Sequence, residues 1–146
     1  TGISRNASDI AEEQIKNTGK NEKELHKMNK LVDDGYNIVT SHKPDFKLFG
    51  KLLNETWKLK RSLSTKISND SIDEIYETAL KNGAVGGKLL GAGGGGFMLF
   101  YAEPENQPKL KKTLKKFLHI PFEFDFSGSE IIFYKPYSEN ILSSNI

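Results

Sequence analysis

Residues 91–96 read Gly-Ala-Gly-Gly-Gly-Gly, six consecutive positions that carry nothing larger than a methyl group. Each glycine in an ordered element costs roughly 0.5–1 kcal/mol of chain entropy relative to alanine. The glycines of this turn therefore cost on the order of 3–5 kcal/mol, against a typical domain stability of about 5–15 kcal/mol. A plain hairpin needs only one or two glycines. The surplus indicates that another group approaches this backbone closely, or that several positions need a positive φ.

A run of unobstructed backbone N–H groups is the surface that a phosphate contact requires. Lys88, three residues before Gly91, adds a positive charge beside it. The alternative is a tight buried crossing of two chain segments with no ligand, and the composition of the turn alone leaves it open.

Other glycine-rich phosphate motifs do not fit the surroundings of this turn. The spacing Gly91-x-Gly93-x-x-Gly96 matches the dinucleotide fingerprint, but that motif must lead into a helix, and here an apolar strand pattern follows. No Lys-Ser/Thr pair closes the glycines as in a P-loop. The Val-Ala-Ile-Lys and His-Arg-Asp sequences of protein kinases are also missing.

The elements that must position the turn alternate in type along the chain. Apolar residues at spacings of three and four predict a helix through Ile10–Ile15, a second through Leu25–Val39, a third over 45–64 and a fourth from Ser71 to Gly83. Short apolar runs predict strands at 87–90 and 97–101, followed by a basic amphipathic helix over 104–118 and strands at 122–126 and 130–134. The fold class is therefore α+β, with four to five helices packed on a small, mostly antiparallel sheet.

Some boundaries and burial patterns are predicted more specifically. Ser71 and Glu74 form a capping box for the fourth helix, and Gly83 stands where a C′ glycine belongs. The run 97–101 has no polar alternation, which predicts an interior strand covered on both faces. In the basic helix, the residues expected to face the core are Leu110, Leu114, Phe117 and Leu118.

Composition excludes several classes of function. The formal net charge is +2, from 21 basic and 19 acidic residues, which is too balanced for a nucleic-acid partner. The chain has no cysteine, and its histidines, at 26, 42 and 119, lack ligand spacing, so no metal site is expected. No stretch approaches the roughly 18 apolar residues of a membrane span. We expect a cytoplasmic protein without membrane contact, and a chain that starts in mid-protein, since Thr1 is neither a starting methionine nor part of a leader.

The glycine turn and its surroundings resemble the third conserved motif of the GHMP kinases, the superfamily of galactokinase, homoserine, mevalonate and phosphomevalonate kinases. The matching run is Gly86-Gly87-Lys88-Leu89-Leu90 followed by 91–96 and Phe97. Three further segments, 1–8, 57–64 and 124–130, resemble the branch that phosphorylates D-glycero-D-manno-heptose 7-phosphate at C1. The resemblance covers residues 1 to about 135.

The resemblance implies a ferredoxin-like C-terminal kinase domain over 1–136 with a tail at 137–146. In that family ATP and Mg²⁺ are used to transfer the γ-phosphoryl group to a substrate hydroxyl. The nucleotide motif Pro-x-x-x-Gly-Leu-Gly-Ser-Ser and the residues for proton removal and metal binding belong to an N-terminal half, and the nucleotide motif does not occur in this sequence. No catalytic residue is therefore expected here, and the implied partners are a sugar phosphate, ATP, that N-terminal half and a possible second copy.

The resemblance also implies roles for particular residues. The residues expected to support the nucleotide's phosphate loop are Lys88, Gly91, Ala92, Gly93, Gly94, Gly95 and Gly96. Those expected to contact the substrate are Thr1, Gly2, Arg5, Lys60 and Arg61. Arginine binds phosphate oxygens in a bidentate way, although Arg5 serves equally as a helix-entry salt bridge. The alternative for Lys60 and Arg61, which lie beside Trp57, is a solvated helix face, since Lys and Arg side chains commonly cover apolar surface. A galactokinase-like substrate, or a metabolite-binding module without chemistry, stays open as an alternative.

Overall fold

The computed structural model describes residue 1 and residues 7–134 of the 146-residue chain. Helices α1 (Ala7–Lys16), α2 (Glu22–Thr40), α3 (Phe46–Ser62) and α4 (Asp70–Lys81) precede an antiparallel pair of strands, β1 (Ala84–Leu89) and β2 (Met98–Ala102), and α5 (Gln107–Thr113) follows. Short 3₁₀ turns at Thr18–Asn21 and Pro104–Asn106 lead into α2 and α5. The α+β class with five α-helices and a small antiparallel sheet is confirmed.

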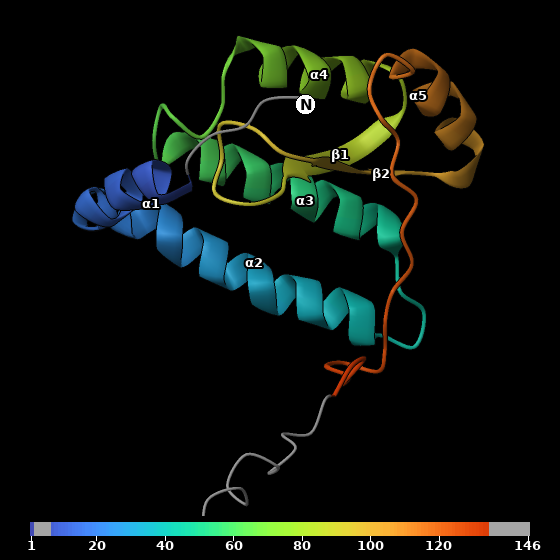
Figure 1. Ribbon diagram of the computed structural model, residues 1–146, viewed down its shortest axis with the longest axis horizontal. Coiled ribbons are helices and arrows are strands. Elements are labelled where there is room, and N and C mark those ends of the chain that lie inside the picture. The colour runs from blue at the N-terminus through green and yellow to red at the C-terminus, as the bar shows by residue number, and fades with distance from the viewer. Residues whose placement is uncertain (2–6, 135–146) are drawn as a thin grey trace, which may run out of the picture.

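The elements form layers, with β1 and β2 between α4 and α5 on one side and α3 on the other (Figure 1). Helix α2 packs along the far side of α3. Helix α3 crosses β1 at a contact between two glycines: a Cβ on Gly86 would overlap the carbonyl oxygen of Gly50. This close approach fixes the strand onto the helix and so sets the position of the turn that follows β1.

The main core lies between α3, α4 and the sheet. Trp57 is fully buried and packs with Tyr76 at a ring-centroid distance of 6.2 Å. The other buried members of this cluster are Ile10, Leu63, Ile67, Ile72 and Leu89. The side chain of Trp57 therefore lies at the centre of this core.

The predicted capping box of α4 is wrong, and the C-terminal signal is confirmed. Helix α4 begins at Asp70, and the Asn69 side chain accepts a hydrogen bond from the Ile72 N–H at 3.1 Å. Asn69 precedes Ser71 and is as good a cap, so the helix starts two positions earlier than predicted. At the other end Gly83 has φ +104°, the left-handed conformation expected of a C′ glycine.

The region after β1 departs most from the sequence predictions. Strand β2 is half-buried rather than covered on both faces: of its five residues only Ala102 is buried. It is also not an interior strand of the described sheet, in which β1 is its one partner. Helix α5 ends at Thr113, and Leu118, expected in the core, is 81% exposed.

The predicted strands 122–126 and 130–134 do not form: both segments are coil, with Phe126 93% and Ile132 95% exposed. A strand is stable only when its backbone groups are paired, and no described strand lies beside these residues.

Candidate functional site

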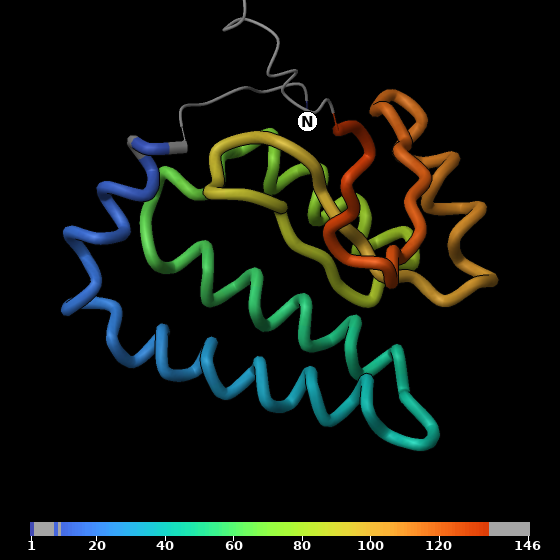
Figure 2. Tube along the Cα trace, turned by 60° about the horizontal axis from the view of Figure 1, so that its bottom comes forward, coloured from blue at the N-terminus to red at the C-terminus, as the bar shows by residue number. Residues whose placement is uncertain are grey.

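The glycine turn connects β1 to β2 at one end of the sheet. The Leu90 N–H donates to the Phe97 carbonyl at 2.8 Å and closes the base of the turn. Residues 91–96 form the arc between these two residues. The arc extends toward the α1 end of the molecule, between α3 and α4 (Figure 2). The turn therefore lies where the first helix and the two core helices come together.

Positive backbone angles account for most of the glycines in the turn. Gly91 has φ +85°, Gly93 +134°, Gly94 +71° and Gly96 +113°, a region that side-chain-bearing residues rarely adopt. Gly95 does not share this conformation. Positive φ therefore explains why four of the five positions are glycine. It does not explain Gly95, which is half-buried and has no positive φ.

Anchors from distant parts of the chain hold the arc. The Gly94 N–H donates to the Ile67 carbonyl at 2.8 Å, and the Asn69 side-chain amide donates to the Gly94 carbonyl at 3.4 Å. From α1, the Gln14 side-chain amide donates to the Ala92 carbonyl at 3.5 Å. The turn is thus bound to the connection between α3 and α4 and to α1. Asn69, Ile67 and Gln14 were missed by sequence reasoning, because nothing local to these residues points to a turn so far along the chain.

Thr1 lies at the other end of the arc. Its amino group donates to the Gly96 carbonyl at 2.9 Å, and the Gly96 N–H donates to the Thr1 Oγ1 at 3.0 Å. Of the substrate-contact residues predicted near the start of the chain, Thr1 is therefore beside the glycine turn. Gly2 and Arg5 lie outside the described residues.

Four backbone N–H groups of the arc donate to no acceptor among residues 1 and 7–134. They belong to Gly91, Ala92, Gly93 and Gly95. Gly91 is exposed and Ala92 and Gly95 are half-buried, whereas Gly93 is buried against Ile67. Successive free N–H groups of this kind are what binds an oxyanion. Of these four residues, Gly91, Ala92 and Gly95 keep exposed surface and are the candidates for a ligand contact.

Two lysines lie on the α3 side of the turn. The Lys60 ammonium donates a hydrogen bond to the Gly91 carbonyl. Burial, and then the charge of Lys88, lower the pKa of Lys60 below its usual 10.5. Neither lysine has a carboxylate partner within the part of the chain that the structure describes. The structure thus brings Lys60 and Lys88 to the glycine turn, and no carboxylate among the described residues pairs with either lysine. Thr1 lies at the other end of the same turn.

Arg61 is held away from this cluster. Its guanidinium donates to the Asp73 carboxylate at 2.7 Å, and both side chains are 34% exposed. The Ser68 hydroxyl donates to the other oxygen of Asp73 at 2.5 Å. Arg61 therefore joins α3 to α4, while its sequence neighbour Lys60 faces the turn.

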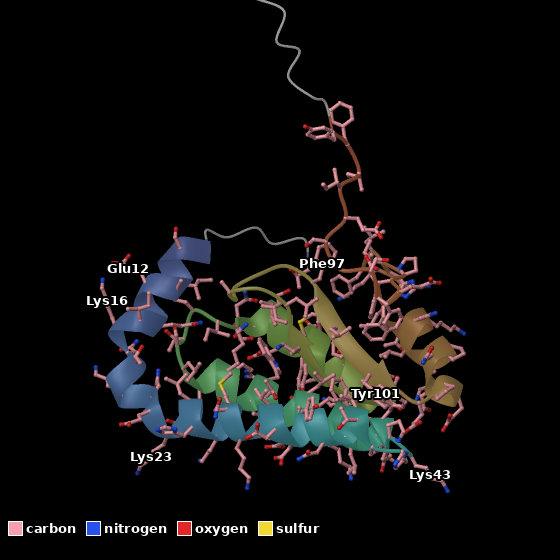
Figure 3. All side chains as sticks on the ribbon, turned by 90° about the horizontal axis from the view of Figure 1, so that it is seen from below. Glu12, Lys16, Lys23, Lys43, Phe97 and Tyr101 are labelled. Carbon is pink, nitrogen blue, oxygen red and sulfur yellow. The ribbon has the colours of Figure 1, made fainter. Side chains whose placement is uncertain are left out.

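Other surface features lie apart from the turn. Figure 3 shows the Glu12–Lys16 pair on the outside of α1, where the two side chains meet at 2.7 Å, and Tyr101 near the other end of the molecule. A shallow depression of about 240 Å³ lies between α1 and the start of α2, lined by residues such as Ala11, Ile15 and Leu25. Within the described residues no three potential ligands are grouped as a metal site would need, and none of the helices has the length and hydropathy of a membrane span.

Comparison with known proteins agrees with this geometry. The family described as GHMP kinases C terminal matches residues 37–120, more than half of the chain. The chain belongs to the GHMP kinases. The family resemblance read from the glycine turn is confirmed, and the matched region includes the whole arc and both lysines beside it.

Curated GHMP kinases resemble the chain over different lengths. D-glycero-alpha-D-manno-heptose 7-phosphate kinase of Campylobacter jejuni is 35% identical over 128 residues, which are 87% of this chain and 38% of that protein. Galactokinase of Candida parapsilosis is 39% identical over 74 residues, 51% of this chain and 14% of the other. This chain therefore spans less than two fifths of the length of either relative.

Solved GHMP kinases share the fold. The structure of L. major mevalonate kinase in complex with R-mevalonate superimposes with a TM-score of 0.67 at 22% identity, covering 79% of this chain and 36% of that one. Mevalonate kinase from a methicillin-resistant Staphylococcus aureus gives a TM-score of 0.54 at 29% identity, over 66% of this chain and 32% of that one. The layered arrangement around the sheet is thus that of a GHMP kinase C-terminal region.

Proposed function

We propose that the chain is the C-terminal part of an ATP-dependent sugar-phosphate kinase that phosphorylates D-glycero-D-manno-heptose 7-phosphate at C1. The observation that supports this proposal is the glycine turn, in which the N–H groups of Gly91, Ala92 and Gly95 have no acceptor among the described residues and lie next to Lys60 and Lys88. The heptose 7-phosphate assignment is supported by the Campylobacter relative, which matches 87% of this chain.

In this proposal the chain supplies one wall of the phosphate-handling cleft. Phosphoryl transfer depends on positioning and charge stabilisation more than on covalent chemistry. The backbone donors of the turn support the loop that holds the ATP phosphates, and the two lysines add positive charge toward the negative charge that develops on the transferred group. The groups that take the hydroxyl proton and hold Mg²⁺ belong to the N-terminal half, with which the domain 1–136 pairs.

The substrate side is assigned to Thr1, Gly2, Arg5 and Lys60. Lys60 qualifies because its ammonium lies at the turn without a carboxylate partner among the described residues. Arg61 is the weakest of the predicted substrate contacts, since its guanidinium binds Asp73. A sugar without a phosphate is the competing substrate class, favoured by the match to galactokinase.

The test uses the longer protein that contains this chain, assayed for ADP release with heptose 7-phosphate, galactose and mevalonate. We expect turnover with the heptose phosphate, and product analysis showing the new phosphate on C1. Turnover with galactose alone would overturn the assignment of the substrate. If none of the three acceptors is turned over, the kinase assignment itself is overturned. Residues 1–146 alone should release no ADP, and release by them would overturn the placement of the catalytic groups elsewhere.

A further inference from the structure

Several carbonyl groups of the glycine turn are held by side chains from other parts of the chain. Three of them accept a side-chain hydrogen bond: Gly91 from Lys60, Ala92 from Gln14 and Gly94 from Asn69. In a trans peptide the C=O group and the N–H group of the next residue point in opposite directions, and the described residues include no cis peptide bond. A side chain that holds one of these carbonyls therefore also fixes the direction of the N–H group that follows it.

The peptide unit between Gly94 and Gly95 depends most on such an anchor. Among the units of the turn whose N–H has no acceptor within residues 1 and 7–134, it alone lies between two glycines. Rotating the unit changes ψ of Gly94 and φ of Gly95, and glycine adopts positive and negative φ about equally readily. The unit between Gly91 and Ala92 differs, because the Ala92 side chain disfavours positive φ. The direction of the Gly95 N–H is therefore set by whatever holds the Gly94 carbonyl.

Asn69 holds this carbonyl from the start of α4. Its side-chain oxygen accepts from the Ile72 N–H at 3.1 Å, and its backbone carbonyl accepts from the Asp73 N–H at 2.9 Å. The carboxamide carries its acceptor and its donors on one planar group, so the helix cap that fixes the oxygen also fixes the nitrogen. That nitrogen lies 3.4 Å from the Gly94 carbonyl oxygen. Gly94 is buried and Asn69 is half-buried, so water replaces this hydrogen bond poorly.

We propose that Asn69 is a positioning residue for phosphoryl transfer, which directs the Gly95 N–H toward the nucleotide's phosphate site by holding the Gly94 carbonyl. This rests on the proposed function, in which the turn supports the binding of the ATP phosphates. A donor that already points at this site stabilises negative charge there without having to reorient during the reaction. One carboxamide thus caps α4 with its oxygen and orients the donor with its nitrogen.

Two substitutions in the longer protein that contains this chain separate the two functions of the carboxamide. Asn69→Ser keeps an oxygen for the Ile72 N–H, since serine caps helices about as well as asparagine, but it has no amide nitrogen for Gly94. Asn69→Ala removes both the cap and the donor. We expect kcat/KM for ATP to fall by about three- to tenfold in both variants, the factor by which one neutral hydrogen bond shifts the rotation of the peptide unit. The Tm should fall clearly further in Asn69→Ala, and the KM for the sugar phosphate should stay unchanged in both.

A second measurement follows the Gly95 N–H group itself and requires no ATP. Glycine is labelled with ¹⁵N in the parent and in Asn69→Ser, and NMR relaxation dispersion detects exchange between orientations on the microsecond to millisecond timescale. We expect the exchange contribution at Gly95 to rise by at least about twofold in Asn69→Ser, because the rotated unit becomes more populated. Gly19, which lies in the 3₁₀ turn before α2, is the internal reference and should behave alike in both proteins.

Equal exchange at Gly95 in the parent and in Asn69→Ser overturns the proposal. A kcat/KM for ATP that falls in Asn69→Ala alone also overturns it, because Asn69 would then act only as a helix cap. An equal rise in the KM for the sugar phosphate would mean that the whole site is distorted, which contradicts a role limited to one donor. If the parent turns over no acceptor, the proposed function fails, whereas the NMR comparison still decides whether Asn69 directs the Gly95 N–H.

Discussion

Gly93 lies directly against the backbone of Ile67. A Cβ placed on Gly93 would be 2.8 Å from the Ile67 Cα, and the neighbouring Gly94 N–H donates to the Ile67 carbonyl at 2.8 Å. Ile67 is fully buried, so its backbone cannot retreat without opening the core. Gly93 is therefore required by packing within the protein itself. Glycines such as Gly93 that hold the turn in place can be distinguished from those that are free to contact a ligand.

Alanine substitutions at Gly93 and Gly91 should differ in their effect on stability. Both glycines have positive φ, which costs an alanine about 1–2 kcal/mol. Gly93→Ala adds the contact with Ile67, worth about 1–3 kcal/mol of overpacking, whereas a Cβ on Gly91 meets nothing within 4 Å. Urea unfolding of the two variants should show the larger loss at Gly93. Equal losses would mean that the Ile67 backbone yields to the new methyl group.

Gly95→Ala should impair catalysis in the longer enzyme without unfolding it. Gly95 has no positive φ, so its backbone angle is open to alanine, and its N–H has no acceptor among the described residues. If the ATP phosphate loop approaches this backbone, the methyl group should lower kcat/KM by about tenfold or more, with Tm within about 3 °C of the parent. Gly19→Ala, in the turn before α2 with nothing within 4 Å of its Cβ, is the control and should change neither value. Full activity of Gly95→Ala would refute the close approach.

Local signals in the sequence predicted the helices because each helix is largely decided by its own residues. The apolar spacing of α3 and α4 and the C′ glycine at Gly83 were read correctly. The start of α4 was not, because Ser68, Asn69, Asp70 and Ser71 all have side chains that can cap. Asn69, the residue that caps the helix, also donates a hydrogen bond to the carbonyl of Gly94, 25 residues further along the chain.

Contacts between distant residues limited the rest of the prediction. Residues 122–126 do alternate between apolar and acidic side chains, as in a strand. A strand forms only beside a pairing partner, however, and no local pattern shows whether one is present. The glycine turn was found from composition alone. Lys60 was named as a candidate, but its contact with Gly91, 31 residues away, could not be foreseen. Arg61, one position further along the helix, points to Asp73 instead, and adjacent residues on a helix face different directions.

Substitutions at Arg61 and Asp73 can decide between a structural and a substrate role for the arginine. If the 2.7 Å ion pair is its whole function, Arg61→Met and Asp73→Asn should each lower the unfolding free energy by up to about 1 kcal/mol. The double variant should then lose less than the sum of the two. The KM for the sugar phosphate should stay unchanged in both. A KM raised by Arg61→Met but not by Asp73→Asn would place the guanidinium at the substrate.

Protonation of Glu13 should lower the stability of the protein in acid. Its carboxylate accepts from the Ser64 hydroxyl at 2.5 Å and pairs with Lys66 at 2.8 Å, joining α1 to the residues after α3. The hydrogen bond from Lys66, then that from Ser64, hold the pKa of Glu13 below its usual 4.5. The stabilisation is therefore present above pH 4.5 and is lost as the pH falls through the lowered value. Glu13→Gln should unfold with a shallower acid dependence, and an unchanged acid limb would show that the ion pair contributes nothing.

Lys60 should change the unfolding free energy at alkaline pH. Burial, and then the charge of Lys88, lower the pKa of Lys60 from 10.5, so the unfolded chain binds this proton more tightly than the folded one. Between the lowered value and pH 10.5, the unfolding free energy should therefore gain a contribution from Lys60 as the pH rises.

Tyrosine titration opposes this gain. Burial raises the pKa of Tyr76 to about 12, so stability from its protonated hydroxyl is lost as the pH rises beyond 10.0. The informative quantity is therefore the difference between the parent and Lys60→Met, measured by urea unfolding from about pH 8 upward. That difference should change with pH in the direction that favours the parent. Lys88→Met should shrink the change, because the second cause of the lowered pKa is removed, and a difference independent of pH would contradict the half-buried position of the Lys60 ammonium beside Gly91.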